Sequence, residues 1–363
     1  MTGPRHIPLI ILGIGHVGRA FLAQLTATHP RLAERYGVAL RPLVLADSQG
    51  ALFNPAGLTP GDVAAAVAAK SGRQSVATLP GALVGISVVE LVQRAVEQGV
   101  ERAIVVDCTA AQGMEVPLTR ALEAGYAAVM ANKRPLAGPW AGAQRFFEHP
   151  RTRFEATVGA GLPVIATLRY LVDTGDEVQR IEGALSGTLG YLCSQLEDGH
   201  AFSEIVNTAQ ARGYTEPDPR EDLSGLDVAR KALILARLAG WPVELGGLRV
   251  EPLYPEAMAA ISTEEFAARL PRLDADFAAY MGAVTGVPRY MAEIRPSGGE
   301  VALKMVGARL AAQLRGTATQ VSFWTRRYQD MPLTLTGPGG GMEVAAAAVL
   351  QDCLDLAQTV SGD

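Results

Sequence analysis

Residues 213–231 bring an unusual number of charged groups into one short segment. Pro217 and Pro219 stiffen its first half, because proline fixes its own backbone torsion and disfavours helix in the residue before it. A rigid, extended stretch of this kind holds the neighbouring carboxylates in place. The segment has five carboxylates, Glu216, Asp218, Glu221, Asp222 and Asp227, and it ends in Lys231.

The second half of this segment predicts a helix. From about Ser224 onwards apolar residues recur at intervals of three and four, and the pattern stops at Gly240. Asp227 and Lys231 are four residues apart, so on a helix their side chains are neighbours. A lysine held by a carboxylate can stabilise developing negative charge and donate a proton. The same residues also fit a structural interpretation, in which Ser224 and Asp227 form a capping box and the ion pair lies on the surface.

A second group of candidate residues lies near the N-terminus, where glycines follow a short strand. The apolar run at 9–12 predicts this strand, and the residues after the glycines have helical spacing. In such a unit the first glycine forms the tight turn, the second lets backbone N–H groups approach a pyrophosphate, and the third packs helix on strand. A tight turn without a ligand is the structural alternative. The candidate nucleotide-binding residues are Gly13, Gly15, His16, Val17 and Gly18.

Further strands predict a doubly wound sheet around this loop. Strand candidates at 42–46, 103–106 and 127–130 alternate with helical stretches at 87–98 and 116–124. Open sheets of this type bind ligands beyond the carboxyl ends of their strands. The residues that follow the strands are therefore candidates for a binding site.

The ends of these strands supply several such candidates. Asp47 follows the second strand and can accept hydrogen bonds from the adenosine ribose of NAD, while it would repel the 2′-phosphate of NADP. Its distance from the glycines is longer than usual, and Ser48 or Arg19 could alter the balance, so both nucleotides stay open. The remaining strand-end candidates are Thr109, which would lie beside the nicotinamide ribose, Ala110 and Lys133.

Composition limits the class of protein. With 363 residues, of which 48% are hydrophobic and 19% charged, the chain has room for two domains with substantial cores. The net charge of -5 and the absence of a basic run make nucleic acid an unexpected partner. No apolar run is long enough to span a membrane and no cleavage-type leader is present, so we expect a cytoplasmic protein without a membrane partner. The three cysteines and five histidines show neither disulfide nor zinc spacing.

The charged segment resembles the signature of the homoserine dehydrogenases. That signature reads glycine-tyrosine-threonine-glutamate-proline-aspartate-proline and leads into an aspartate-valine-alanine-arginine-lysine helix, and both parts are present at 213–219 and 227–231. The stretches 155–163, 176–191 and 320–341 are also similar to this family. Strong similarity covers roughly half of the chain, because it fades after residue 245 and returns only near 320.

The resemblance implies an NAD(P)-dependent oxidoreductase that interconverts L-aspartate 4-semialdehyde and L-homoserine, in the biosynthesis of threonine, methionine and isoleucine. A hydride moves between the nicotinamide and the aldehyde carbon, and Lys231 supplies the proton for the oxygen. Glu216 and Asp227 then bind the substrate, with Asp222 behind them. Lys133 belongs to the active site, where it balances the substrate carboxylate or relays a proton.

The resemblance also implies contacts with a cofactor and with an ion. Gly213 and Gly341 would approach the cofactor. A monovalent cation such as sodium would bind the side chain of Glu155 and the backbone carbonyls of Val158, Ala160 and Leu162, which suits the preference of hard cations for oxygen.

The implied fold class is α/β. A Rossmann-type, doubly wound NAD(P)-binding domain covers 1–152, an α+β domain for substrate binding, catalysis and dimerisation covers 153–325, and a C-terminal segment, 326–363, returns its helix to the first domain. Family members are usually dimers, so we expect a homodimer. We expect neither a C-terminal regulatory domain nor an N-terminal kinase domain.

Two rival interpretations fit part of the same pattern. The first is another NAD(P)-dependent oxidoreductase of the same layout, acting on a different small amino or hydroxy acid. The second is a non-catalytic nucleotide-sensing protein, which would have no need of the acidic residues and lysines together. An aspartate-semialdehyde dehydrogenase is disfavoured, because no cysteine lies in a setting suited to an acyl-enzyme.

Overall fold

The computed structural model describes residues 3–283 and 285–359, and the chain forms two compact units. The first unit runs to Gly161 and resumes at Gly341, and the second comprises Leu162–Gly340. The expected domain boundaries lay after residues 152 and 325, and the limits of the compact units lie 9 and 15 residues further on. Residues 326–340 stay with the second unit because they contain a strand of its sheet, so only the last helix returns.

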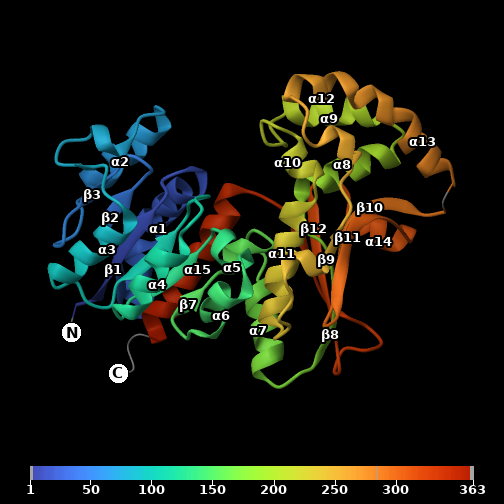
Figure 1. The fold of residues 1–363 in the computed structure, drawn as a ribbon. Helices are drawn as coiled ribbons and strands as arrows, with labels where there is room; N and C mark the ends of the chain where they lie inside the picture. The colour runs from blue at the N-terminus through green and yellow to red at the C-terminus, as the bar shows by residue number, and fades with distance from the viewer. Residues whose placement is uncertain (1–2, 284, 360–363) are drawn as a thin grey trace. The chain divides into compact units, whose positions relative to one another are not determined.

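The first unit is built on a seven-stranded sheet in the order β4-β3-β2-β1-β5-β6-β7 (Figure 1). Five strands run parallel, and β3 and β4 form an antiparallel edge. The chain steps outward from β1 in both directions, which creates the topological switch point where such sheets bind nucleotides. The strands are β1 (Arg5–Leu12), β2 (Val38–Ala46), β3 (Gly50–Phe53), β4 (Leu83–Val84), β5 (Ile104–Asp107), β6 (Ala127–Met130) and β7 (Thr152–Arg153).

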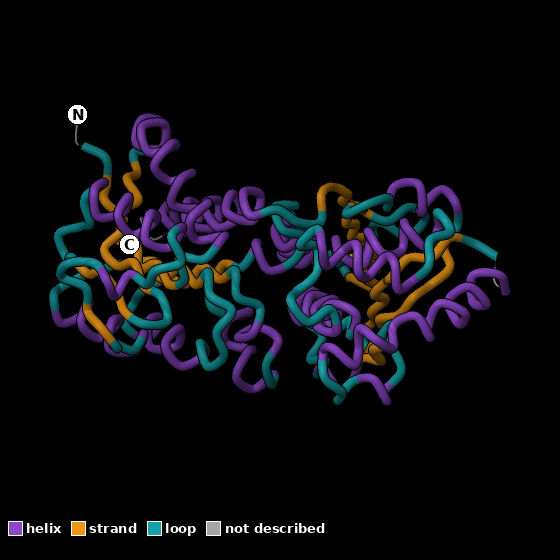
Figure 2. Tube along the Cα trace, turned by 90° about the horizontal axis from the view of Figure 1, so that it is seen from above, coloured by secondary structure: helices purple, strands orange, loops and turns teal. Residues whose placement is uncertain are grey.

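Helices cover both sides of this sheet, as Figure 2 shows, and this confirms the doubly wound fold. Parallel strands covered on both faces need continuous apolar sequence, and Leu9, Ile11 and Val106 are fully buried. The helices are α1 (His16–Tyr36), α2 (Pro60–Ser71), α3 (Val88–Glu97), α4 (Glu115–Glu123), α5 (Arg134–Ala137) and α6 (Trp140–Glu148), with short 3₁₀ turns η1 (Val76–Thr78) and η2 (Glu155–Thr157).

The C-terminal helix α15 (Met342–Thr359) belongs to this first unit, as expected (Figure 1, red). Its apolar residues Ala346, Val349 and Leu356 are buried in the same core as the strands. The side-chain amide of Gln24 on α1 also donates a hydrogen bond to the Glu343 carbonyl at 2.7 Å. The chain therefore leaves this unit, forms the second one, and comes back.

The second unit has a six-stranded sheet in the order β13-β12-β8-β10-β11-β9. One face is apolar, because Ile181, Phe323 and Ile294 are paired neighbours and are all buried. The strands are β8 (Val178–Ala184), β9 (Leu248–Val250), β10 (Val287–Arg295), β11 (Gly298–Val306), β12 (Ala318–Thr325) and β13 (Leu333–Pro338).

The helices of the second unit lie between these strands in the sequence. They are α7 (Val164–Asp173), α8 (Gly187–Glu197), α9 (Phe202–Ala211), α10 (Arg220–Leu223), α11 (Leu226–Leu238), α12 (Thr263–Arg269), α13 (Asp274–Ala283) and α14 (Ala308–Gln313), with 3₁₀ turns η3 (Leu245–Gly247), η4 (Glu256–Met258) and η5 (Leu270–Leu273). Within the part of the chain that the structure describes, no helix is long and apolar enough to cross a membrane.

The predicted capping box at the start of α11 is wrong. Gly225 precedes the helix with φ +71°, a conformation that favours glycine, and a Cβ there would lie 1.9 Å from the Tyr290 hydroxyl oxygen. The Ser224 hydroxyl instead donates to the Glu221 carbonyl at 2.9 Å. The helix therefore starts at a glycine turn that packs against Tyr290. Asp227 does not cap the helix and forms an ion pair with Lys231 instead.

Candidate active site

In the second unit, Lys231 lies on α11 with its ammonium group between two oxygens. Its Nζ forms an ion pair with Asp227 Oδ2 at 2.7 Å and donates a hydrogen bond to the Leu185 carbonyl, also at 2.7 Å. The Lys231 side chain is only 14% exposed. The ammonium is therefore fixed in position from two elements, the helix and the segment that follows β8.

A second carboxylate, Asp222, holds the backbone beside Glu216. Its Oδ2 accepts a hydrogen bond from the Glu216 N–H at 2.8 Å. Burial raises the pKa of Asp222, and the charges of Glu216 and Asp227 add to the rise, although the Glu216 N–H and the Thr188 hydroxyl oppose it. Asp222 therefore contacts the backbone of Glu216, and its placement behind the substrate-binding acids stays a prediction.

The turn into α8 joins this cluster. Thr188 donates from its hydroxyl to the Tyr214 carbonyl at 2.7 Å, which ties α8 to the segment that carries Glu216. Gly213 has φ +69° and ends helix α9, where its N–H donates to the Gln210 carbonyl at 3.0 Å. The need for a left-handed residue at the end of α9 explains the glycine at position 213. Its expected approach to a cofactor stays a prediction.

In the first unit, the three glycines after β1 have different surroundings. A Cβ at Gly13, where φ is +87°, would lie 2.8 Å from the Cys108 carbonyl oxygen, and one at Gly18 would lie 2.1 Å from the Gly13 oxygen. A Cβ at Gly15 would meet nothing within 4 Å. Packing therefore requires the first and third glycines, whereas the second faces open space at the start of α1, beside His16 and Val17. This is the arrangement expected for a pyrophosphate at a helix N-terminus.

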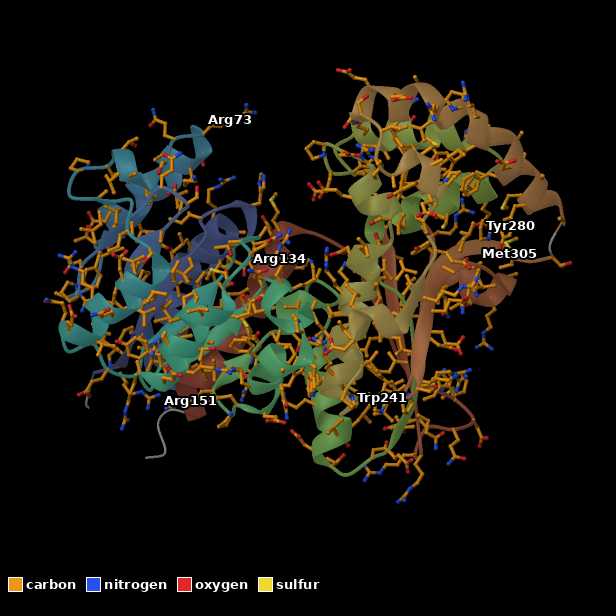
Figure 3. All side chains as sticks on the ribbon, viewed as in Figure 1. Arg73, Arg134, Arg151, Trp241, Tyr280 and Met305 are labelled. Atoms are coloured by element: carbon orange, nitrogen blue, oxygen red, sulfur yellow. The ribbon has the colours of Figure 1, made fainter. Side chains whose placement is uncertain are left out.

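Two neighbouring strand ends reach the same edge of this sheet. Thr109 follows β5, and its N–H and hydroxyl both donate to Asp107 Oδ1, at 2.9 and 2.6 Å. Ala110 is exposed beside it. Lys133 follows β6 and precedes α5, whose first residue, Arg134, is labelled in Figure 3. Parallel strands end at a common edge, so the glycine loop, Thr109 and Lys133 share it.

Asp47, at the end of β2, is engaged in contacts within the protein. Its Oδ2 accepts from Lys70 Nζ at 2.9 Å and from the Val76 N–H at 3.1 Å, and its Oδ1 accepts from the Ser75 hydroxyl at 2.9 Å and from the Gln49 N–H at 2.9 Å. Burial raises the pKa of Asp47, but these hydrogen bonds outweigh it and lower the pKa to about 2. The side chain is 7% exposed. Its expected role as a ribose acceptor therefore has to compete with these four donors.

Cys108 does not have the character of a nucleophile. Burial, together with the charge of Asp107, raises the pKa of its thiol to about 12. Burial does the same for Cys193, also to about 12. Both thiols are protonated at neutral pH, which agrees with the expectation that no acyl-enzyme forms.

The candidate cation ligands lie in the segment where the chain passes from one unit to the other. Glu155 is 7% exposed, Val158 is buried, and Ala160 has φ +57° after Gly159 at +82°. Leu162 opens the second unit, and its carbonyl accepts from the Val164 N–H at 2.7 Å.

The Glu155 N–H donates to Asp352 Oδ2 at 2.8 Å. The charge of Glu155 also acts on Asp352, so the two buried carboxyl groups are within electrostatic reach of each other. Among the described residues, no group of three or more acidic, histidine or cysteine side chains could hold a metal ion.

The structure therefore gathers the predicted residues into two sets. Glu216, Asp222, Asp227 and Lys231 lie together in the second unit, and the glycine loop, Thr109 and Lys133 lie along the sheet edge of the first. Gly341 opens the returning segment with φ +137°. No sequence pattern indicated the Leu185 carbonyl, Thr188, Asp107, Lys70 or Asp352, because each has a partner distant in sequence.

Several known proteins that are named homoserine dehydrogenase are similar to this chain. A family model described as homoserine dehydrogenase matches residues 163–354. The homoserine dehydrogenase of Emericella nidulans is 35% identical over 98% of this chain and 98% of its own length, and that of Saccharomyces cerevisiae is 33% identical over 97% and 98%. A bifunctional aspartokinase/homoserine dehydrogenase of Zea mays is 40% identical over 70% of this chain, but the match spans only 29% of that longer protein.

Solved structures share the fold along nearly the whole chain. A Candida auris protein of unknown function is 31% identical, with a TM-score of 0.83, and the match covers 97% of this chain and 98% of that one. A hyperthermophilic archaeal homoserine dehydrogenase in complex with NADPH is 21% identical, with a TM-score of 0.76 and 98% coverage of both chains. On the family match and the full-length relatives together, this chain belongs to the homoserine dehydrogenase family.

Proposed function

We propose that this chain catalyses the NAD(P)-dependent interconversion of L-homoserine and L-aspartate 4-semialdehyde. The observation that carries the proposal is the Lys231 ammonium, held at 2.7 Å by both Asp227 and the Leu185 carbonyl, with the acids of the signature around it. Membership of the homoserine dehydrogenase family supports the choice of substrate. It also disfavours an oxidoreductase for another acid and a silent nucleotide sensor.

In the direction of reduction, the bound nucleotide would supply a hydride to the aldehyde carbon, and the carbonyl oxygen would become an alkoxide. Lys231 stabilises this charge and gives up one proton to it, so that the product is the alcohol. In oxidation the same amine, in its neutral form, takes the hydroxyl proton. The nucleotide supplies the hydride chemistry, and the protein supplies orientation and charge.

The substrate is a zwitterion, which gives the other residues distinct tasks. Glu216 and Asp227 bind the α-ammonium or the hydroxyl of the substrate. Asp222 holds the Glu216 backbone at 2.8 Å and so sets the direction of that side chain. Lys133, from the nucleotide-binding unit, is the candidate partner for the substrate carboxylate.

The first test is homoserine oxidation by the purified protein with NAD⁺ and NADP⁺ compared, together with the variant Lys231→Met. We expect the variant to lose at least ~10²-fold in kcat, the usual scale of general acid–base catalysis, with nucleotide binding little changed. The matched control is Arg230→Met, the neighbouring cation on the same helix, which should keep near-normal turnover. Substantial turnover in the Lys231 variant would remove this residue as the proton donor.

We also propose that the nucleotide site accepts NADP(H). The carboxylate that would repel a 2′-phosphate is neutralised, because Asp47 is paired with Lys70 at 2.9 Å. Arg19 donates to the Lys70 carbonyl at 3.5 Å. Arg73, labelled in Figure 3, lies in the loop between Lys70 and Ser75 and is exposed. Cationic groups thus outnumber the single acid at this strand end. The relative that binds NADPH supports the same choice.

A monovalent cation at Glu155 is a further part of the proposal. Burial raises the pKa of Asp352 well above its usual value, and the charge of Glu155 adds to the rise, although the Glu155 N–H opposes it. A cation between backbone carbonyls and these acids would offset the negative charge, and oxygen ligands suit sodium. The ligands would be Glu155 and the carbonyls of Val158, Ala160 and Leu162.

Finally, we propose a homodimer formed through the second unit. One face of its sheet packs against helices, whereas the opposite face carries polar side chains and Trp324. An antiparallel sheet can leave such a face to solvent or to a partner. A second copy of the chain is the partner that the family resemblance indicates.

A further inference from the structure

We propose that Asp107, a carboxylate that the proton transfer does not use, is the positioning residue that fixes the nucleotide-side loops of the active site. The inference rests on the proposed function, because it concerns the same nucleotide edge. Asp107 is the last residue of β5 and is 0% exposed. It lies in the centre of the sheet, paired with Leu12 on β1 and with Met130 on β6.

The side chain of Asp107 binds both neighbouring loops. Its Oδ1 accepts from the N–H and the hydroxyl of Thr109, at 2.9 and 2.6 Å, and its Oδ2 accepts from Asn132 Nδ2 at 3.1 Å. Its backbone carbonyl accepts from the Ala131 and Asn132 N–H groups at 2.8 and 3.3 Å. One residue therefore connects the loop after β5 with the loop after β6.

Asn132 carries this connection on to Lys133. Its Nδ2 also donates to the Ala111 carbonyl at 3.0 Å, and its Oδ1 accepts from the Arg134 N–H at 3.1 Å. The N–H groups of the two residues that flank Lys133 are thus held, and the lysine lies at the start of α5.

The glycine loop is the third segment in contact. A Cβ placed at Gly13 would lie 2.9 Å from Thr109 Cγ2, so the threonine packs directly against the loop that faces the pyrophosphate. The rotamer of Thr109 is fixed by its bond to Asp107. The carboxylate therefore controls how closely the loop after β5 approaches the nucleotide loop.

A buried carboxylate is an unfavourable choice for stability alone. Removing the charge from water is costly, and apolar residues of similar volume often stabilise a protein better than buried charges do. Burial also raises the pKa of Asp107, against the hydrogen bonds from Thr109 and Asn132. The geometric benefit of the aspartate is that both of its oxygens accept hydrogen bonds. An asparagine at this position could not do so, because its side-chain nitrogen would face the Nδ2 of Asn132.

The test compares Asp107→Asn with Asn132→Ala, which breaks the same bridge from its other side. NADPH binding is read from nucleotide fluorescence without turnover, and kcat and KM for homoserine are measured separately. We expect each variant to weaken NADPH binding about tenfold and to lower kcat, with KM for homoserine little changed. The loss in the double variant should be smaller than the sum of the two single losses, because the two residues share one bridge while each also has contacts of its own.

The matched control is Asp176→Asn. Asp176 is another buried aspartate, 8% exposed, which accepts from the Thr325 hydroxyl at 2.7 Å and from the Arg327 N–H at 3.2 Å in the second unit. Its variant should lower the thermal midpoint and leave NADPH binding unchanged. The proposal is overturned if Asp107→Asn or Asn132→Ala behaves like this control, or if the two effects add.

The test of Asp107 still gives an answer in two cases of failure. If Asp107→Asn does not fold, Asn132→Ala decides alone, since it leaves the carboxylate with its Thr109 partners. If the wild-type protein binds NADPH but oxidises no homoserine, the proposed function fails while the binding test of Asp107 still stands.

Discussion

Single residues at the two candidate sites differ in how far their partners lie along the chain. Asp227 and Lys231 are one helical turn apart, so local periodicity predicted their 2.7 Å contact. The partner of Asp47 is Lys70, 23 residues later and on another element. No local pattern indicates that pair, which is why an acid expected to face a ribose is instead enclosed by donors.

This residue-scale finding leads to a prediction about nucleotide choice. Replacing Lys70 by methionine removes a cation and leaves the charge of Asp47 without its ion-pair partner, although Ser75 and the Gln49 and Val76 N–H groups still hold the carboxylate. The uncompensated charge would repel a 2′-phosphate. We expect KM for NADPH to rise about tenfold, the usual scale for a lost charged hydrogen bond, and KM for NADH to change less than about twofold. Steady-state kinetics with both nucleotides provide the measurement.

The control for this prediction is Arg120→Met, a cation of the same unit that is 66% exposed and pairs with Glu123. It removes the same charge and should leave both KM values unaltered. An equal rise in both KM values for the Lys70 variant would mean that the residue supports the fold of the loop and does not recognise the phosphate.

At the scale of elements, strands and long helices were predictable, whereas their junctions were not. The apolar runs in the first unit predicted β5 and β6 within a residue or two, because fully buried parallel strands have an unbroken apolar sequence. The start of α11 was not predictable, since it depends on the contact of Gly225 with Tyr290, which is distant in sequence. Helix ends set by tertiary contacts leave little local signal.

One junction between elements carries a second prediction. The turn η2 and the helix α15 meet through Glu155 and Asp352, which are both buried. If a monovalent cation binds there only in the folded state, it should stabilise the protein by linkage, by about 2.7 kcal/mol at a hundredfold excess over its Kd. We expect a thermal midpoint several degrees higher in sodium chloride than in choline chloride of equal ionic strength.

The variant Glu155→Gln should sharply reduce this difference between the two salts, because it removes the only negative charge from the proposed set of ligands. Glu343→Gln, an exposed acid at the start of the same helix, is its control and should retain the difference. Equal midpoints for the wild-type protein in both salts would count against a cation at this junction.

At the scale of the whole molecule, the chain order explains where the unit boundaries fall. The similarity to the family placed the second boundary near residue 325, but β13 pairs with β12 through Ser322 and Thr334 and keeps residues up to Gly340 in the second unit. Strand pairing over such a short connection has no periodic signature. The return of α15 was expected from the resemblance to the family, and the burial of its apolar residues in the core of the first unit agrees with it.

The polar face of the sheet in the second unit is the molecular feature that bears on assembly. Glu182 on β8 pairs with Ser322 and Glu293 on either side, so all three lie on this face. Trp324 lies there too, and its Nε1 donates to Glu182 Oε2 at 3.1 Å, while the Arg180 guanidinium is 4.3 Å from the ring centroid. Aromatic and arginine side chains of this kind are enriched in protein interfaces.

A dimer formed through this face should dissociate when a charge replaces the tryptophan. In a two-fold dimer each copy contributes the same surface, so Trp324→Glu places two new charges in one interface. Light scattering of the wild-type chain should give twice the mass of one chain at micromolar concentration, and the variant should give the mass of one. Met331→Glu, which adds the same charge at an exposed position of the following loop, should remain a dimer. A wild-type protein of single-chain mass, or a Trp324 variant that stays dimeric, would exclude this face as the interface.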